Sequence, residues 1–282
     1  MPSASPPLRL PPGNAWRSAS EAARERLPER PAAALVLGSG LDAVTGAVDV
    51  EEEIPYVELP GFPATTVPGH AGRLAFGRLE GVPLLVFRGR IHLYEGHGAA
   101  ASALPSVMAW ALGARVVVLT AAVGSLVPEI APGSLAVCGD HLNLLREDVL
   151  RGWTREDGSP AFVDLSDVYD RELSDAAAAG AGLRRAVYAA VPGPSFETRA
   201  EAEYLRRIGA SVVGMSLVPE AVPARALDLR VLGLLSVANA VGVEVSHDAV
   251  LEATGRTAGA IGDILAEVLP RLSKPTQDRQ ET

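Results

Sequence analysis

The chain has 282 residues, 48% of them hydrophobic and 21% charged, and a formal net charge of -9 at pH 7. This is the composition of an ordinary globular protein with ample core, and the negative charge argues against non-specific nucleic-acid binding. An anionic substrate would therefore need a locally positive pocket.

Single residues exclude further classes of protein. Cys138 is the only cysteine, so a disulfide framework is excluded and a cytoplasmic location is predicted. Lys274 is the only lysine, which excludes a Walker-type phosphate loop and argues against Schiff-base chemistry. The most membrane-like segment, residues 103–124, is interrupted by Gly113 and Arg115, so no membrane partner is predicted.

The first half of the chain is predicted to alternate helices and strands after a disordered segment over residues 1–14. Asn14 can cap the first helix, and Glu80-Gly81 between two apolar runs predicts a hairpin turn. In order, we predict a helix over 15–27, strands over 33–37, 73–79 and 82–87, a helix over 99–112 and a strand over 115–120.

The second half continues this alternation after a strand over 134–137 and a long polar connection over 146–170. Strands are predicted over 186–191, 211–213 and 230–237, helices over 199–208, 219–227 and 248–269, and a disordered tail over 273–282. Because no linker interrupts the alternation, we predict one α/β domain over residues 15–272. Its centre should be a mixed, mostly parallel twisted sheet flanked by helices.

A dense polar stretch, Gly89-Arg90-Ile91-His92-Leu93-Tyr94-Glu95-Gly96, directly follows a predicted strand. Ligands of open α/β sheets gather where strands end. The Arg90 guanidinium suits phosphate, His92 can add a donor, and Tyr94 offers a flat face with a polar tip. The stretch predicts a site for an oxyanion beside a sugar or ring; the alternative is a polar strand end whose charges pair on the surface.

Polar groups also follow other predicted strands. Gly38-Ser39-Gly40 can offer a hydroxyl and backbone N–H groups to an anion. Glu197 lies in a rigid Gly-Pro-Ser-Phe setting, and Asn239 ends an apolar strand, where a buried amide needs a partner. In a mainly parallel sheet these groups would meet at one rim; the alternative is that they are ordinary loop residues.

Six motifs, taken in order, resemble the trimeric purine nucleoside phosphorylases over residues 33–269. They are Gly38-Ser39-Gly40, Gly69-His70, the stretch Gly89 to Gly96, Gly193-Pro194-Ser195-Phe196-Glu197-Thr198, Gly214-Met215-Ser216-x-x-Pro219-Glu220 and His247. The resemblance implies the reversible conversion of a purine nucleoside and phosphate to free purine and ribose 1-phosphate. It implies no metal and no organic cofactor, with inorganic phosphate as co-substrate.

The resemblance also implies roles for individual residues. The phosphate-binding positions are matched by Ser39, His70, Arg90, His92, the backbone N–H of Ala122, and Ser216. The nucleoside-binding positions are matched by Tyr94, Phe162, Phe196, Glu197, Val213, Met215, Asn239 and His247. Of these, His92, Glu197, Asn239 and His247, together with Glu95, are the implied catalytic residues.

Some of these matches carry a more specific meaning. Phe162 matches an aromatic side chain that a neighbouring subunit inserts over the sugar, which implies a homotrimer. Glu95 matches a carboxylate that holds the phosphate-site histidine and arginine. Glu197 could accept a hydrogen bond from purine N1–H, which adenine lacks, so hypoxanthine and guanine should be preferred.

The sequence departs from the family pattern at a few positions. Asp42 stands where a glycine is usual and adds a negative charge near a phosphate loop. Ala121, Val123 and Ser125 replace usual residues around Ala122, and Ser125 would be strained if its position needed a positive φ. Ala238 replaces a threonine and loses a hydrogen bond beside Asn239. We expect an active enzyme with weaker phosphate affinity or altered base preference.

Two rival functions remain open from the residues. A methylthioadenosine phosphorylase should lack the Glu197 and Asn239 pair and should have an apolar pocket in place of His247. A catalytically weakened purine-binding homologue is suggested by the departures from the pattern. Purine release from a panel of nucleosides, with and without phosphate, separates the three.

Overall fold

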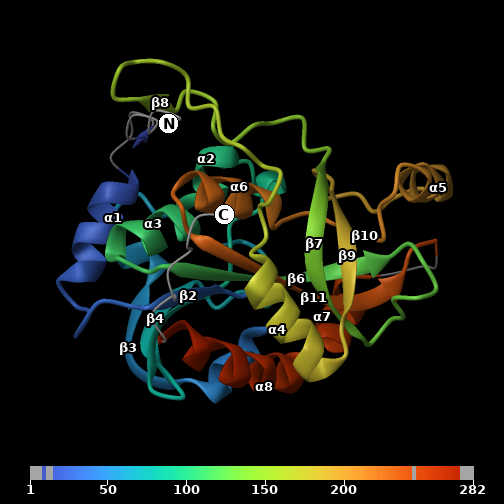
Figure 1. Cartoon of the computed structure of the whole chain (residues 1–282), viewed down its shortest axis with the longest axis horizontal. Helices are drawn as coiled ribbons and strands as arrows, with labels where there is room; N and C mark the ends of the chain where they lie inside the picture. Colours follow the sequence, from blue (N-terminus) through green and yellow to red (C-terminus); the bar gives the residue numbers. More distant parts are fainter. Residues whose placement is uncertain (1–7, 11–14, 243–245, 274–282) are drawn as a thin grey trace, which may run out of the picture.

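The computed structural model describes residues 8–10, 15–242 and 246–273 (Figure 1). Its centre is a nine-stranded sheet. Across the sheet the strands are β10 (Val212–Gly214), β9 (Arg184–Ala190), β7 (Leu135–Asn143), β11 (Arg230–Ala240), β6 (Val116–Ser125), β2 (Ala33–Val36), β5 (Val82–Arg88), β4 (Arg73–Leu79) and β3 (Asp49–Pro55). A separate two-stranded sheet pairs β1 (Leu8–Arg9) with β8 (Thr154–Arg155).

The large sheet is mixed and mostly parallel, as predicted. The pairs β10–β9, β9–β7, β11–β6, β6–β2 and β2–β5 are parallel. The pairs β7–β11, β5–β4 and β4–β3 are antiparallel. The predicted hairpin of β4 and β5 is confirmed, and its turn residues Glu80 and Gly81 both have positive φ, at 49° and 76°, as a two-residue hairpin turn requires.

One further pairing closes part of the sheet on itself. The end of β6 pairs antiparallel with β10, with Gly124 opposite Val213 and Ser125 opposite Val212. The strands β6, β11, β7, β9 and β10 therefore form a closed ring. Parallel pairing already brings the ends of β6 and β11 together, and this closure adds β10 beside them.

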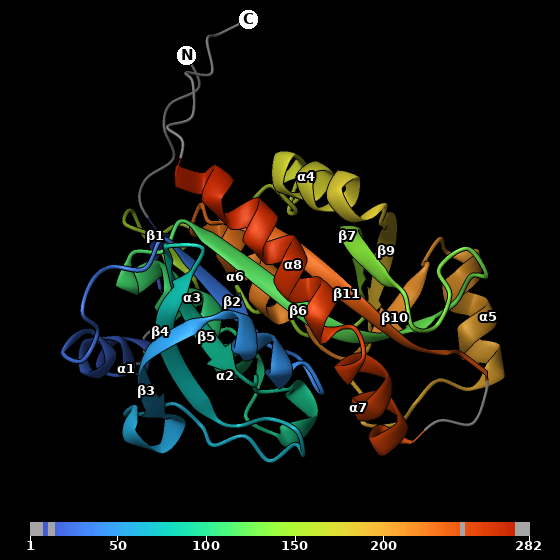
Figure 2. The ribbon, with the colours of Figure 1, turned by 90° about the horizontal axis from the view of Figure 1, so that it is seen from below.

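Helices cover both faces of the sheet (Figures 1 and 2). One face carries α1 (Ala15–Arg24), α2 (Ala99–Ser102), α3 (Leu104–Leu112) and α6 (Val218–Ala226), and the other carries α4 (Arg171–Ala181), α7 (His247–Gly255) and α8 (Ala258–Val268). Alternate residues of β2 feed the two cores: Ala34 and Val36 belong to the first and Ala33 and Leu35 to the second. A strand buried on both faces reads as a continuous apolar run, which is why β2 was recognisable.

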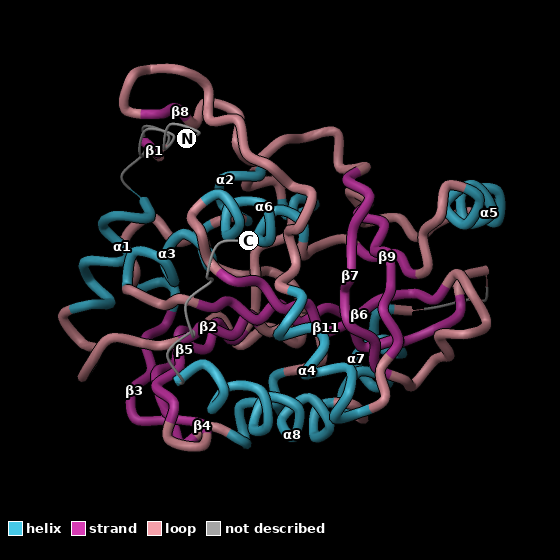
Figure 3. The backbone as a smooth tube through the Cα atoms, viewed as in Figure 1, coloured by secondary structure: helices cyan, strands magenta, loops and turns pink. Residues whose placement is uncertain are grey.

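The remaining elements lie around these layers. The helix α5 (Arg199–Arg207) projects from one end of the molecule (Figure 1). A long loop from β7 to α4 contains β8 (Figure 3). Short 3-10 helices are η1 (Asp42–Ala47), η2 (Tyr56–Glu58), η3 (Leu93–Glu95) and η4 (Leu269–Ser273). No helix among the described residues has the length and apolar character needed to span a bilayer.

Several predicted elements were wrong in extent. The closing helix over 248–269 is two helices, α7 and α8. Two hydrogen bonds lie at the break between them. Thr254 Oγ1 donates to Ser39 O at 3.0 Å, and the hydroxyls of Ser236 and Thr257 lie 2.7 Å apart. The helix over 99–112 is likewise divided, into α2 and α3. The edge strand β3 and the helix α4 were not predicted.

The predicted chain ends fall largely outside the described residues. Of the N-terminal segment 1–14, which includes the capping Asn14, only residues 8–10 are described, and Leu8–Arg9 form β1 instead of disordered chain. Of the tail 273–282, only Ser273 is described, at the end of η4.

Candidate active site

A cavity of about 420 Å³ lies among the ends of β2, β5, β6, β10 and β11. Its size is typical of a small-molecule site. Of the fifteen site residues predicted from the sequence, His70, Glu95 and Phe162 do not line it. The other twelve do: Ser39, Arg90, His92, Tyr94, Ala122, Phe196, Glu197, Val213, Met215, Ser216, Asn239 and His247.

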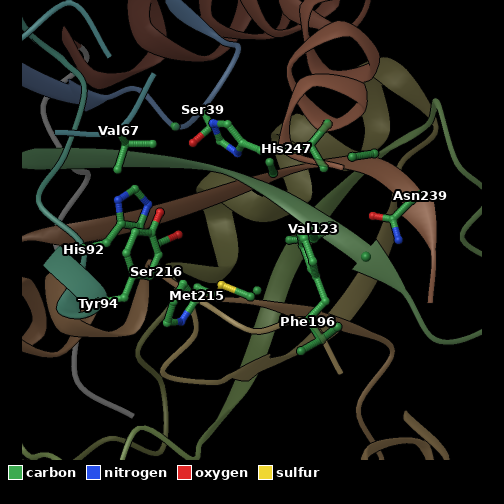
Figure 4. A pocket seen from close by; sticks show the side chains of 18 of the residues that line it. Ser39, Val67, His92, Tyr94, Val123, Phe196, Met215, Ser216, Asn239 and His247 are labelled. Carbon is green, nitrogen blue, oxygen red and sulfur yellow. The ribbon is translucent and has the colours of Figure 1, made fainter. Parts of the chain in front are cut away.

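The cavity has two chemically different ends (Figure 4). His92, Tyr94 and Ser216 gather at one end, and Asn239 and Phe196 lie at the other, with Val123 and Met215 between them. The first end is cationic through Arg90 and rich in hydroxyl and imidazole groups. The second end combines an aromatic ring with an amide and a carboxylate.

Arg90 is the charged group at the first end and is only 1% exposed. Its Nη1 donates to Ser216 Oγ at 2.9 Å and its Nη2 to Val36 O at 3.4 Å. Its Nε lies 3.2 Å from Glu220 Oε1. The guanidinium is therefore contacted from β2, from the segment before α6, and from α6 itself. A planar, permanently charged group held in this way suits a tetrahedral oxyanion.

His70 lies behind the cavity wall and supports Ser39. The Arg90 backbone N–H donates to His70 Nδ1 at 3.2 Å, and His70 Nε2 lies 3.2 Å from Ser39 Oγ. His70 Nδ1 also lies 3.1 Å from Arg90 O, so the Arg90 backbone and the Ser39 hydroxyl together hold this ring in place. Burial, together with the charges of His92 and Arg90, lowers the pKa of His70 to about 3, so its imidazole is neutral at pH 7. Gly89 has φ 114° and a Cβ there would lie 2.6 Å from His70 Cβ, so only glycine allows this contact.

Glu95 connects His92 to the loop before β4. Its Oε1 accepts from the His92 backbone N–H at 2.7 Å and lies 3.4 Å from His92 Nδ1. Its Oε2 accepts from Thr66 N–H at 2.8 Å and Thr66 Oγ1 at 2.7 Å. Burial lowers the pKa of His92 although its bond to Glu95 acts in the opposite direction. His92 is therefore oriented by a carboxylate and presents its other ring edge to the cavity.

Three rings stack along this side of the site. The centroids of His70 and His92 are 5.2 Å apart, and those of His92 and Tyr94 are 4.7 Å apart, with planes inclined by 24° and 11°. Tyr94 is the outermost ring and faces the middle of the cavity, where Met215 also lies (Figure 4). This gives the centre of the cavity an aromatic wall and a thioether.

A β-bulge places Asn239 at the second end. The register between β11 and β6 shifts between Val237 and Asn239, so that Asn239 stands opposite Gly124. Bulges commonly redirect a side chain beside an active site, and here the extra residue is Ala238. Asn239 Nδ2 donates only weakly, to Ala240 O at 3.2 Å. Burial raises the pKa of Glu197 on the neighbouring wall.

His247 closes the cavity beside the loop that carries His70. Its Nε2 lies 3.2 Å from Pro68 O, and because a carbonyl oxygen only accepts, we assign a proton to Nε2. Thr66, Val67 and Pro68 of the same loop also line the cavity, although the sequence had singled out only His70 there.

Phe162 lies on the long β7–α4 loop and is 80% exposed. It does not line the cavity of its own chain. Its backbone is fixed, because Arg155 Nη2 donates to Phe162 O at 2.7 Å. The side chain is thus presented outward from a tethered loop.

The departures from the family pattern have specific surroundings. Asp42 pairs with Arg88, at 2.9 Å to Nε and 2.6 Å to Nη2, and does not line the cavity. Ser125 lies in β6 without a positive φ, so the conditional strain does not arise. Ala121 is fully buried in the core, Val123 lines the cavity, and Ala238 is the bulge residue.

Sequence reasoning also missed the supporting residues Glu220 and Tyr188. Tyr188 OH accepts from the Ser216 backbone N–H at 3.0 Å, and a Cβ on Gly214 would lie 2.4 Å from that oxygen. Glu220 had been noted only as part of a motif. The contacts of Glu220 with Arg90 and of Tyr188 with Ser216 join residues distant in the chain, so no local pattern reveals them.

Residues 32–270 match the family model of the phosphorylase superfamily. The chain therefore belongs to the phosphorylase superfamily. Its curated relatives include purine nucleoside phosphorylase 1 of Bacillus subtilis, 38% identical over 240 residues that cover 82% of this chain and 89% of the relative. The purine nucleoside phosphorylase of Mycobacterium leprae is 40% identical over 245 residues, covering 85% of this chain and 89% of the relative.

Solved structures are similar over almost the whole chain. Purine nucleoside phosphorylase of Schistosoma mansoni in complex with adenosine superposes with a TM-score of 0.85 at 29% identity, covering 92% of this chain and 98% of that one. A Schistosoma purine nucleoside phosphorylase in complex with hypoxanthine gives 0.83 at 29% identity, with 92% and 97% coverage. The predicted single α/β domain and the predicted family are thereby confirmed.

Proposed function

We propose that the chain catalyses the reversible phosphorolysis of purine nucleosides, namely inosine, guanosine and their deoxy forms. The products would be a free purine and ribose 1-phosphate, as in purine salvage. The observation that carries this is the two-ended cavity, with Arg90 at one end and Asn239 with Glu197 at the other. The names of its relatives support the same activity.

Inorganic phosphate would occupy the cationic end as co-substrate. Arg90, His92, Ser39, Ser216 and the Ala122 N–H would bind its oxygens, and neutral His70 would orient the Ser39 hydroxyl. Glu95 would act by holding His92. No metal or organic cofactor is proposed for the reaction.

The chemistry follows from the charges that the reaction develops. The C1′–N9 bond breaks and a C1′–O bond to phosphate forms, so positive charge builds on the ribose and the bonding electron pair leaves with the purine. The phosphate anion would offset the positive charge on the ribose. The Asn239 amide would donate to N7 as negative charge develops on the purine. Tyr94 and Met215 would contact the ribose, and Nδ1 of His247 would accept from the 5′-hydroxyl.

Base preference would depend on Glu197. An ionised carboxylate accepts from the N1–H of hypoxanthine or guanine but finds no donor at N1 of adenine, and a mismatched buried polar group is costly. Phe196 and Val213 would enclose the purine faces. We therefore propose a preference for 6-oxopurines.

Phe162 supports a further proposal about assembly. A large apolar side chain that is 80% exposed on a tethered loop suits a contact with a second copy, and we propose a homotrimer in which it covers the neighbouring sugar.

A cytoplasmic location is proposed from the single cysteine.

The defining experiment measures purine release from inosine, guanosine, adenosine and methylthioadenosine, with and without phosphate. Phosphate-dependent release should be fastest with inosine and guanosine. Absence of phosphate-dependent turnover with every substrate would overturn the enzymatic function, while a preference for methylthioadenosine would overturn only the proposed specificity.

Asn239→Ala tests the leaving-group step directly. Loss of one pre-placed donor should lower kcat for inosine about 10²–10³-fold, equivalent to about 2.7–4 kcal/mol. Asn143→Ala, at the exposed end of β7, is the matched control and should retain activity. A reduction of less than about threefold (~0.7 kcal/mol) for Asn239→Ala would contradict this role.

A further inference from the structure

Glu220 is a buried carboxylate that directly contacts the phosphate-binding arginine. It is 2% exposed, and its Oε1 lies 3.2 Å from Arg90 Nε. Neither of its oxygens, nor Arg90 Nε, has a hydrogen-bond partner of good geometry among the described residues. The contact is therefore a charge pairing without a directed hydrogen bond.

A buried pair of charges such as Glu220 and Arg90 adds little to the stability of a fold. Burying two charges costs several kcal/mol of desolvation, and an apolar pair of similar volume is often as stable or more stable. Burial raises the pKa of Glu220 to about 7, although the charge of Arg90 and the Leu217 backbone N–H act against this. The buried pair is therefore weak evidence for a stabilising role of Glu220, and its position against Arg90 has to be explained by geometry.

The backbone before Glu220 is also unusual. Leu217 has φ 66° and ψ -53°, and the Val218 N–H donates to Ser216 O at 2.8 Å across it. This is a γ-turn of the rare, strained kind, at a fully buried leucine. The turn reverses the chain so that Ser216 before it and Glu220 in the first turn of α6 both face Arg90. A helix N-terminus also favours a negative charge at this place.

We propose that Glu220 is a positioning residue that holds the Arg90 guanidinium in its phosphate-binding orientation. Glu220 contacts Nε, while Ser216 and Val36 contact the two terminal nitrogens. Without Glu220 the Nε side of the guanidinium has no fixed neighbour, and the fork geometry that recognises an oxyanion is lost. The inference rests on the proposed phosphorolysis, because it concerns the same site.

The test compares Glu220→Met, which removes the oxygens, with Glu220→Gln, which keeps one acceptor for Nε. In Glu220→Met the KM for phosphate should rise about tenfold or more, or about 1.4 kcal/mol, while the KM for inosine stays within about twofold. Glu220→Gln should restore phosphate KM to within about threefold of wild type. Glu267→Gln, which breaks the exposed Glu267–Arg271 ion pair at the end of α8, is the matched control and should leave both KM values unchanged.

A purely structural Glu220 would lower stability without separating the two KM values. If Glu220→Met does not fold, Glu220→Asp keeps the charge but withdraws it by one methylene, and phosphate KM should still rise at least about threefold. An unchanged phosphate KM in the folded variants would overturn the proposal.

A second readout separates this proposal from the proposed function. Phosphate should raise the Tm of the wild type, and by less for Glu220→Met, whether or not any nucleoside is cleaved. If the wild type shows no turnover, but phosphate raises its Tm more than that of Glu220→Met, the role of Glu220 stands and phosphorolysis is rejected. Equal phosphate-induced shifts in both proteins would reject the role of Glu220.

Discussion

Glu95 illustrates how one carboxylate stabilises two parts of the site. Its side chain is 1% exposed and interacts with His92 and Thr66. Burial alone would raise the pKa of Glu95, but hydrogen bonds from His92 and Thr66 outweigh burial and lower it to about 2 from 4.5. Because the folded state favours the ionised form, Glu95 contributes stability fully above pH 4.5, and this contribution is lost as the pH falls toward 2.

Glu95→Gln should therefore show a pH-dependent loss of stability. Its Tm should lie below that of the wild type at neutral pH, and the difference should shrink as the pH falls through about 4.5. Thermal unfolding of both proteins at a series of pH values measures this. A difference that stays constant down to the lowest pH at which both fold would contradict the argument.

Glu197→Gln is the matched control with the opposite sign. Burial raises the pKa of Glu197, so its ionisation destabilises the fold and wild-type stability is lost as the pH rises above 4.5. The Tm of this variant relative to the wild type should therefore increase with pH, while that of Glu95→Gln decreases.

At the scale of elements, Thr120 of β6 joins the end of β2 to the Gly38-Ser39-Gly40 turn. It is fully buried, its Oγ1 donates to Val36 O at 3.0 Å, and it accepts from the Gly38 N–H at 3.0 Å. Gly38 directly precedes Ser39, so this hydroxyl fixes the backbone from which Ser39 extends.

Thr120→Val should destabilise the protein by about 1–3 kcal/mol, because it leaves the buried Gly38 N–H without a partner. Denaturant unfolding measures the change. Thr45→Val is a strong control, since Thr45 Oγ1 is buried without a hydrogen-bond partner among the described residues. That variant should be unchanged within about 0.5 kcal/mol or more stable. Equal losses in the two variants would show that the hydroxyl bonds of Thr120 are unimportant.

Elements were predictable where local pattern and burial agree. The apolar runs of β2 and β5 and the Glu80-Gly81 turn were recognised, because these segments are buried on both faces or need positive φ. β3 was missed because Asp49–Pro55 carries four acidic residues whose charges are offset by arginines of other strands, as Arg78 and Arg88 pair with Glu51 and Glu53. The break between α7 and α8 depends on contacts of Thr254 and Thr257 with β2 and β11 segments, which no local pattern reveals.

At the scale of the whole molecule, the cavity depends on how the sheet closes. Motifs identified the residues around the cavity, but their convergence was expected from a parallel rim. β10 instead runs antiparallel to β6 and closes the ring, and this brings Val213 and Met215 to Asn239. Glu220 and Tyr188 escaped prediction because each acts on a residue that only the tertiary fold brings near. Phe162 differs from all of these, since its role would need a second chain.

Phe162 can be tested by mixing subunits. In the proposed homotrimer, Phe162→Ala in every subunit should cost about 1–3 kcal/mol of nucleoside binding, or about 5- to 150-fold in kcat/KM, because an aromatic cover is removed. Asn239→Ala subunits should be nearly inactive but still carry Phe162. When both are combined in mixed trimers, each Phe162→Ala site beside an Asn239→Ala neighbour regains its cover, while its own Asn239 is intact.

Activity per Phe162→Ala subunit should therefore rise toward the wild-type value as Asn239→Ala subunits are added in excess. Light scattering establishes the trimer mass, and a tag on one variant confirms that mixed trimers form. The double variant Phe162→Ala/Asn239→Ala is the control, because it assembles in the same way but donates no ring and should rescue nothing. Activity that stays at the sum of the separate homotrimers, in verified mixed trimers, would mean that Phe162 does not act across the interface.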